Sequence, residues 1–406
     1  MRHVTVGRVL ALSALVACTW AFATSCSDAE DEAPAPTSTG CASPGDCSHN
    51  GVCEESQCVC EAGWSGETCA TIKLAPASAD SGFRADNTDS WGAAVLKGDD
   101  GLYHMWVSVV ANNCLIGTWA RNSMTVYATS KTPEGPYEWQ KEAFPVMSHE
   151  VDVKRAPDGR YVAFVTAGLD KDGFVSVSGY GEPCDCDAST GEPKGSCEFG
   201  ASTEATVMLI ADSPAGPWSQ PKVLLRPKEL DDGIDANFSA DILPDGSLVG
   251  LWRTYPQTAT GAGASQVHWV VASNFEDPST YEWQDDKEPL FSAPFDGSVS
   301  EGLEDMFVWY DKDKKVAHAL FHDMVEREEG ESFDALGHAW STDGKTWTYT
   351  GIAASAKVAL EEGGETFSAR ARPHGLVVDG KLSHLTFAEN ALIEGRNYTL
   401  VQAVAP

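Results

Sequence analysis

One hairpin pattern occurs five times in this chain of 406 residues, and it restricts the fold more than any other feature of the sequence. In each copy a short apolar run meets an Asp-Gly or Asp-Lys turn, and a second run rich in aromatic residues follows. Such turns supply the positive φ angles that a tight β-hairpin needs. The five copies span 92–108, 151–167, 238–255, 301–324 and 373–389.

A third strand follows each hairpin. These strands lie in 123–137, 205–218, 267–281, 336–347 and 397–405. A unit of several strands that repeats along a chain predicts a β-propeller, so five units predict an all-β fold with five blades. Because the chain ends after the third strand of the last unit, 72–74 is expected to begin the strand that completes this blade and covers its edge.

The N-terminus predicts an export signal at 1–26. A basic start precedes an apolar run, 9–23, that is too short for a permanent membrane helix. Cys18 ends a bacterial lipobox, and Cys26 ends a poorer match that stands directly before a polar tether. Two predictions remain: a lipid on Cys18 or Cys26 that anchors the protein in the outer membrane, or ordinary cleavage near Ala23 without a lipid.

Two short segments separate this signal from the repeats. Residues 27–40 are acidic and rich in Pro, Ser and Thr, so they are expected to form a disordered linker. Residues 41–69 hold six cysteines and almost no core, which predicts disulfides in an exported protein. Spacing alone leaves fifteen pairings open.

The cysteine spacing and the Cys-x-Cys-x-x-Gly-Trp string at 58–64 resemble an EGF-like module. The residues before the first cysteine lack the acidic pattern of calcium-binding EGF modules, so no calcium is expected in it. A stiff spacer, an adhesion module and a folded plug without a partner are its candidate roles. The resemblance implies the pairs Cys41–Cys53, Cys47–Cys58 and Cys60–Cys69.

The propeller is expected to span 70–406 as one large domain. It holds four further cysteines, Cys114, Cys184, Cys186 and Cys197, and the last three lie in an insertion within the second unit. Their spacing suits either zinc or two disulfides that staple loops, and an oxidising compartment favours the disulfides.

The net charge of −32 arises from 60 Asp and Glu against 28 Lys and Arg. Nucleic acids and anionic membrane surfaces would be repelled, and the sequence has no basic stripe or Gly-rich phosphate loop. A neutral or cationic ligand is therefore expected.

Polar residues stand at the same place before the turn of every hairpin. The first strand of a propeller blade lines the central channel, so these residues should converge on one mouth. The positions hold Asp89, Ser90 and Trp91 in the first unit, His149, Glu150 and Asp152 in the second, Asp235 and Asn237 in the third, Glu304 and Asp305 in the fourth, and Arg372 and His374 in the fifth.

Each of these residues also has a purely structural interpretation, such as a turn cap, a solvated strand position or a buried histidine bonded to backbone. The presence of polar residues at this place in all five units favours a functional site over five separate structural roles. Carboxylates in a closed channel are costly unless they are paired, and Arg372 and His374 offer partners. Trp91 and Trp119 are predicted to stack on sugar rings.

Paired carboxylates with a flanking arginine suit glycoside hydrolysis. One carboxylic acid protonates the leaving oxygen, another carboxylate activates water, and a neighbouring acid raises the pKa of the proton donor. Glu304 and Asp305 fit this scheme. Since adjacent strand residues point to opposite faces, only one of them is expected to enter the channel.

Several strings carry a family resemblance. They are the Gly-Pro-aromatic turns at 135–137 and 216–218, Glu-Asp-x-Phe-x-Trp at 304–309 and Arg-Pro-His at 372–374. With the five units, they resemble the five-bladed β-propeller glycosidases of the glycoside hydrolase family 43 type. Members of an uncharacterised branch of that family carry Ser-Trp-Gly in blade one, and the same string at 90–92 makes this chain resemble that branch.

That family uses an Asp base in blade one, an Asp that tunes pKa values in blade two and a Glu acid in blade three. The resemblance implies Asp89 as the base and Glu150 or Asp152 as the tuning residue. The third unit offers Asp235 and Asn237 but no Glu, so Glu304 or Asp305 is expected to replace the acid. A structural calcium ion in the channel near His374 is implied by the resemblance alone, and the residues themselves indicate no certain cofactor or metal.

These observations predict a monomeric, exported or cell-surface glycoside hydrolase-like protein that acts on glycans containing arabinose, xylose or galactose. The departure in blade three and the EGF-like module leave two alternatives open. One is a carbohydrate-binding protein without catalysis, and the other is an adhesion protein that binds through its rim loops. The sequence does not specify the linkage or the mode of cleavage.

Overall fold

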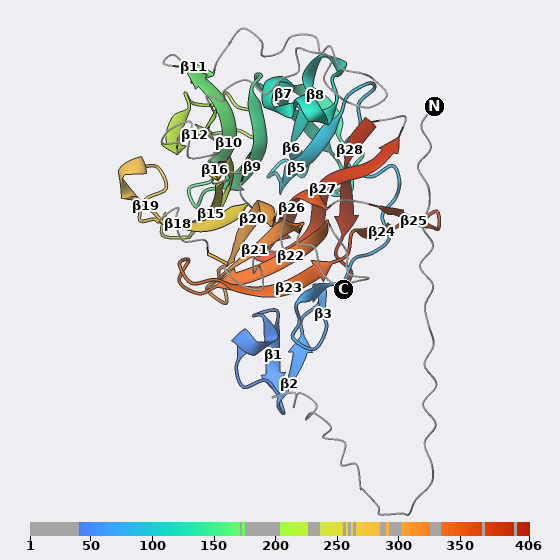
Figure 1. Ribbon diagram of the computed structural model, residues 1–406, viewed down its shortest axis with the longest axis vertical. Helices are drawn as coiled ribbons and strands as arrows, with labels where there is room; N and C mark the ends of the chain where they lie inside the picture. Colours follow the sequence, from blue (N-terminus) through green and yellow to red (C-terminus); the bar gives the residue numbers. More distant parts are fainter. Residues whose placement is uncertain are drawn as a thin grey trace, which may run out of the picture. The chain divides into compact units, whose positions relative to one another are not determined.

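The five hairpin units form five antiparallel sheets, the blades of a β-propeller, in the computed structural model of the protein (Figure 1). The structure describes residues 40–170, 173–174, 204–225, 236–254, 257–258, 261–262, 265–284, 290–291, 302–324, 334–367, 370–393 and 396–406. The predicted signal, the linker, Cys18, Cys26, Asp235, Cys184, Cys186 and Cys197 lie outside the described residues.

Each blade runs outward from a first strand. The first blade contains β5 (Ser90–Lys97), β6 (Tyr103–Val110), β7 (Ser123–Ser130) and β8 (Glu138–Phe144), and the second contains β9 (Ser148–Arg155), β10 (Tyr161–Asp170), β12 (Glu204–Ala211) and β13 (Lys222–Leu225). The third contains β14 (Ala236–Ile242), β15 (Leu248–Thr254), β18 (Gln266–Ala272) and β19 (Tyr281–Trp283), and the fourth contains β20 (Leu303–Asp311), β21 (Val316–Asp323), β22 (Ala335–Ser341) and β23 (Thr348–Ala354). The fifth contains β26 (Ala371–Val378), β27 (Lys381–Ile393) and β28 (Arg396–Ala403).

Short elements decorate these sheets. They are the strand β11 (Gly173–Phe174) beside β10, the ribbons β16 (Gln257–Thr258) with β17 (Gly261–Ala262) and β24 (Lys357–Ala359) with β25 (Glu365–Phe367), the helix α1 (Trp119–Asn122), and the 3-10 turns η2 (Ala111–Asn113), η3 (Ile116–Thr118) and η4 (Pro278–Thr280). No helix in the described part of the chain combines the length and apolar character needed to span a bilayer.

The predicted turns are present. Gly101, Gly159, Gly246 and Gly380 have positive φ in four of the hairpins, and Lys315 takes that conformation, at φ 58°, in the fourth hairpin along the chain. The first strands β5, β9, β14, β20 and β26 contact one another in order around the ring. Successive side chains of a strand point to opposite faces of its blade, and so toward one neighbouring blade or the other. Five apolar clusters fill the five spaces between the blades.

The N-terminal end of the propeller closes the ring beside β28. Leu74 pairs antiparallel with Val404, and Phe83 pairs antiparallel with Thr399. The predicted closing segment is therefore confirmed, although Ile72 itself belongs to the preceding module, where it pairs with Trp64. This pairing covers an edge of the last blade that would otherwise be open.

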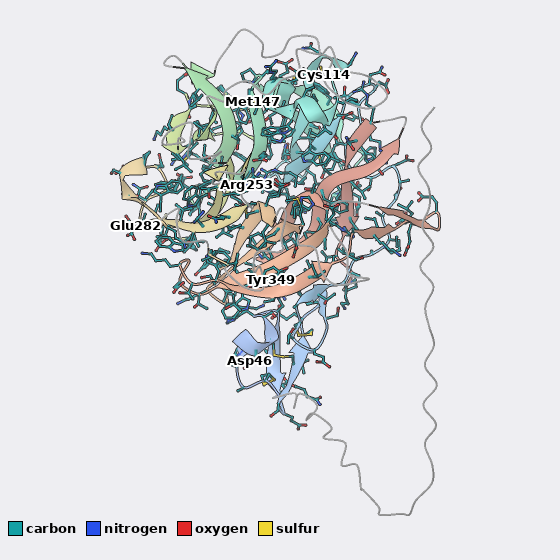
Figure 2. The ribbon with its side chains drawn as sticks, viewed as in Figure 1. Asp46, Cys114, Met147, Arg253, Glu282 and Tyr349 are labelled. Carbon is teal, nitrogen blue, oxygen red and sulfur yellow. A yellow bond between two sulfur atoms is a disulfide. The ribbon has the colours of Figure 1, made fainter. Side chains whose placement is uncertain are left out.

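The six N-terminal cysteines form the three disulfides that the EGF resemblance implies, visible as yellow bonds in Figure 2. Cys114 is also disulfide-bonded. The module contains η1 (Pro44–Cys47), the hairpin β1 (Gly51–Glu54) and β2 (Gln57–Cys60), and the ribbon β3 (Trp64–Ser65) with β4 (Thr71–Ile72).

The module packs against the fourth and fifth blades rather than standing apart as a spacer. Trp64 belongs to the same buried cluster as Phe307 of β20 and Leu385 of β27. The Trp64 ring lies 5.0 Å from that of His338. Lys314 Nζ lies 2.8 Å from both Glu61 Oε1 and the carbonyl oxygen of His49. These contacts show a module that packs on the propeller, and its predicted roles stay predictions.

This packing predicts that Trp64→Ala destabilises the propeller as well as the module. Trp64 is buried, and removing a buried Trp side chain costs about 3–5 kcal/mol of unfolding free energy. Guanidinium unfolding of the oxidised chain, followed by circular dichroism, measures the loss. Val59→Ala is the control because Val59 lies in the same module and is exposed. An unchanged propeller transition in Trp64→Ala would show that the module is an independent spacer.

Candidate active site

A β-bulge interrupts all five inner strands at the same point of their hairpins. The register with the second strand shifts there in every blade. The first residues of the five bulges are Trp91, Glu150, Asn237, Asp305 and Arg372. The bulges thus place four of the predicted polar residues and Trp91 at the equivalent point of each blade.

Four of these residues have left-handed backbone conformations. The φ angles are 54° at Glu150, 50° at Asn237, 54° at Asp305 and 51° at Arg372, while in the first blade Gly92 takes this role at 68°. Such conformations cost on the order of 1–3 kcal/mol in non-glycine residues and cluster at functional sites. The same backbone conformation thus recurs at the bulge of each of these four blades.

Hydrogen bonds join the bulges of successive blades. Glu150 Oε2 accepts from the backbone N–H of Asn237 at 3.0 Å, and Asn237 Nδ2 donates to Asp305 Oδ1 at 2.8 Å. Asp305 Oδ2 then accepts from the backbone N–H of Arg372 at 2.9 Å. Asn237 therefore bridges two carboxylates that come from different blades.

Glu304 extends this network toward solvent. Its side chain is 19% exposed, forms an ion pair with Arg253, and lies 3.3 Å from His322 Nδ1. His322 Nδ1 also lies 3.9 Å from Asp305 Oδ2. The expectation that only one of the adjacent acids enters the channel is wrong, because the bulge at Asp305 breaks the strand alternation and brings both into one network.

The acids of this network differ in pKa. Burial, followed by the charges of Glu304 and Glu150, raises the pKa of Asp305 to about 7. Burial alone would also raise the pKa of Glu150, but Arg372, His149 and Arg253 outweigh it and lower this pKa. At neutral pH the structure thus holds one readily protonated carboxyl beside one ionised carboxylate.

Histidines on either side of the acids differ in charge. Burial lowers the pKa of His322, but its hydrogen bonds to Asp334 and Glu304 outweigh this and raise the pKa to about 10. Burial lowers the pKa of His149 to about 4. His149 Nδ1 lies 2.6 Å from Ser123 Oγ, and its ring stacks on Trp119 at 4.8 Å. His322 is thus a cation at neutral pH, while His149 is neutral.

A second layer lies directly beyond the bulges. Asp152 Oδ1 lies 2.6 Å from His374 Nε2, and Asp152 Oδ2 accepts from Ser239 Oγ at 2.6 Å. The ring of Phe307 packs on His374 at 4.2 Å. These residues join four blades beneath the layer of Asp305.

Asp89 lies elsewhere in the ring. Its carboxylate accepts from the N–H of Ile116 at 2.8 Å and from Asn397 Nδ2 at 3.2 Å, and Arg396 Nη1 is 3.4 Å away. These bonds join the first blade to the last, and the described contacts do not connect Asp89 to Asp305. Trp91 packs against Ala371 of the fifth blade. The predicted roles of Asp89 and Trp91 stay predictions.

Three buried polar atoms near the acids have no hydrogen-bond partner within the described residues. They are Asn237 Oδ1, Arg372 Nη1 and His374 Nδ1. A buried polar group without a partner costs about 1–3 kcal/mol, so such atoms call for a water or ligand partner. One donor and two potential acceptors match the hydroxyl groups of a sugar.

Glu304, Asp305 and His322 have ligand atoms within 4.8 Å of one another, a spacing that could hold a metal ion. Arg253 already pairs with Glu304, and both oxygens of Asp305 accept hydrogen bonds. His322 is moreover a cation at neutral pH. A metal ion held by this group would have to displace these partners.

Sequence reasoning missed Arg253 and His322. Both lie on second strands, opposite residues that flank a bulge: Arg253 pairs with Ala236 and His322 with Glu304. The hairpin spacing could have predicted them, because a residue that pairs with the channel-mouth end of a first strand lies at that same end of the channel.

Comparison with known proteins supports both parts of the fold. Residues 43–71 match the Teneurin-like EGF domain model. The sequence matches no curated protein. Solved structures resemble the propeller, among them a protein of unknown function from Dyadobacter fermentans, with 12% identity over 82% of this chain and 98% of that chain and a TM-score of 0.50.

Two similar structures are glycoside hydrolases. A thermostable family-43 glycoside hydrolase has 11% identity over 81% of this chain and 92% of its own, with a TM-score of 0.50. A GH62 hydrolase in complex with xylotriose has 10% identity over 83% of this chain and 98% of its own, also with a TM-score of 0.50. The chain thus shares the five-bladed fold of these hydrolases.

Gly92 offers a test of the bulge layer. A Cβ at this position would lie 2.3 Å from Arg372 Cγ, whereas a Cβ at Gly101 meets nothing within 4 Å. Gly92→Ala is therefore expected to displace Arg372 and to lower the melting temperature more than Gly101→Ala. Both glycines have positive φ, so the control carries the same backbone strain. Equal melting temperatures would contradict the close contact between Gly92 and Arg372.

The raised pKa of Asp305 predicts a pH-dependent stability difference. The folded pKa of about 7 exceeds the ordinary value of 3.8, so Asp305 destabilises the fold as pH rises from about 4 through 7 and its proton is lost. Relative to Asp305→Asn, the wild type should lose unfolding free energy on the order of 4 kcal/mol over this range. Chemical denaturation at several pH values measures it, and a constant difference would contradict the raised pKa.

Proposed function

We propose that this protein is a glycoside hydrolase whose proton donor is Asp305 and whose ionised partner is Glu150. The observation that carries the proposal is the pair of carboxyl groups bridged by Asn237, whose environments move their pKa values in opposite directions. Two carboxyl groups with separated pKa values can serve as acid and base at one pH.

The chemistry follows from these protonation states. Asp305 would donate its proton to the glycosidic oxygen as the bond to the anomeric carbon breaks. Glu150 would take a proton from the attacking water, or would attack the anomeric carbon itself. Arg372, whose charge lowers the pKa of Glu150, would keep that group ionised. Glu304, the more exposed acid, would face the incoming sugar.

The proposed substrates are glycans that contain arabinose, xylose or galactose. The unpartnered atoms of Asn237, Arg372 and His374 support a polyhydroxylated ligand, and Trp119 can stack on a sugar ring next to His149. The similar GH62 hydrolase was solved with xylotriose. These points support a neutral saccharide, which also suits a protein of net charge −32.

The proposed location is outside the cytoplasm. Three disulfides within 41–69 need an oxidising compartment, and the N-terminus predicts an export signal. A lipid on Cys18 or Cys26, with anchoring in the outer membrane, remains part of the proposal. Mass spectrometry of the mature N-terminus tests it.

A carbohydrate-binding protein without turnover is the second candidate. The observation that favours it is burial: Asp305 is 3% exposed, and hydrogen bonds occupy both of its oxygens. A carboxyl group held in this way can serve the structure of the ring alone. Glycan binding without product release would favour this candidate.

Substitution of the two carboxyl groups tests the proposal on aryl glycosides and on arabinan, xylan and galactan. Glu150→Gln should reduce kcat/KM on every substrate cleaved, by about 10²–10⁴-fold. Asp305→Asn should reduce it as strongly on polysaccharides but less on aryl glycosides, whose leaving groups need less protonation. The wild-type rate should fall as pH rises above 7.

Asp89→Asn and Glu304→Gln are the comparison variants in the same assays. A loss in Asp89→Asn as large as that in Glu150→Gln would return the role of base to Asp89. Unchanged turnover in both Glu150→Gln and Asp305→Asn would remove the proposed pair.

A further inference from the structure

A lysine lies inside the channel, beneath the layer of acids. Lys154 belongs to β9, is only 6% exposed, and points its Nζ atom toward the opposite side of the ring. Nζ donates to the carbonyl oxygen of Val308, on β20, at 2.6 Å. It also lies 4.1 Å from the centre of the Phe307 ring. The ammonium group thus connects the second blade to the fourth.

Asp152 is the counter-ion of this lysine. Its Oδ1 lies 3.3 Å from Lys154 Nζ and 2.6 Å from His374 Nε2, while its Oδ2 accepts from Ser239 Oγ. Ser239 Oγ in turn accepts from the N–H of Val308 at 2.8 Å. The buried carboxylate of Asp152 therefore contacts polar groups from the second, third and fifth blades.

The electrostatics agree with a resident positive charge. Burial raises the pKa of Asp152, but Lys154 and His374 outweigh it, so that this pKa is lowered. Burial raises the pKa of Asp241, the next acid of the third blade, and Lys154 opposes that rise. The ammonium group thus favours the ionised form of Asp152, while burial keeps the pKa of Asp241 above its ordinary value.

These residues do not fit the calcium ion that the resemblance to family 43 implies. Calcium takes six to eight oxygen ligands at about 2.3–2.6 Å. Both oxygens of Asp152 are already bonded, and the neighbouring atom without a partner, His374 Nδ1, is a nitrogen. Burial, with smaller contributions from the charges of Lys154 and Arg372, lowers the pKa of His374 to about 4, and these two charges would also repel a metal ion beside it.

We propose that Lys154 is the resident cation of the channel and takes the place of a metal ion there. Its ammonium group pairs with Asp152 and, through the carbonyl oxygen of Val308, ties the second blade to the fourth beneath the bulge layer. Lys154 is thereby a positioning residue, which acts on the site through Asp152 and His374. The proposal goes beyond glycan cleavage, because it holds whether or not the protein is an enzyme.

Metal analysis and calorimetry of the purified full chain test this proposal. The wild type should carry no stoichiometric calcium, and EDTA or added calcium chloride should leave its melting temperature unchanged. Lys154→Met keeps the length of the side chain but removes its charge, and it should lower the melting temperature by about 5–10 °C. Lys345→Met is the control, because Lys345 pairs with Glu282 on the surface and should give no comparable shift.

The double variant Lys154→Met with Asp152→Asn should recover part of the loss, since it removes the anion that is left without its cation. Stoichiometric calcium in the wild type, or a fall in its melting temperature with EDTA, would overturn the proposal. So would a Lys154→Met variant as stable as the wild type. If that variant does not fold, the two wild-type measurements decide, and Lys154→Arg, which keeps the charge, should fold.

Discussion

The site depends on one repeated device, a β-bulge whose side chain satisfies the backbone of the next blade. Glu150 accepts the N–H of Asn237, and Asp305 accepts the N–H of Arg372. A bulge leaves backbone groups outside the strand ladder, and buried groups of this kind need a partner. The carboxylates of Glu150 and Asp305 therefore satisfy backbone N–H groups at the same positions where they bring negative charge together.

Charge in this layer is arranged unevenly rather than simply neutralised. Glu150 lies under the influence of Arg372 and Arg253, whereas Asp305 faces two other acids, Glu304 and Glu150. A proton shared by such a group resides most readily on Asp305, because ionising it would add a third neighbouring anion. The asymmetry that the proposed glycoside cleavage requires thus arises from five blades that carry different residues at one equivalent place.

The sequence was sufficient to predict the architecture and the converging first strands. The Asp-Gly and Asp-Lys turns define the hairpins, and counting back from each turn leads to Glu150, Asn237, Asp305 and Arg372. It was insufficient for the pairing of Glu304 with Arg253, because alternation holds only for regular strands and a bulge breaks it. The contact of Lys154 with Val308 was equally hidden, since the two residues meet only once the second and fourth blades lie in one ring.

The EGF-like module fits into the same account. Buried ion pairs contribute little net stability to a fold, because their attraction is offset by the cost of removing both charges from water. Removing one member of a pair leaves the other charge buried without compensation. A ring lined with acids therefore needs stability from other contacts. Apolar contacts of Trp64 with the fourth and fifth blades, and the pairing of Leu74 with Val404 beside the last blade, are two such sources. Disulfides keep that module folded without a core of its own. The module therefore adds apolar burial to the fourth blade, whose first strand β20 carries both Phe307 and Asp305.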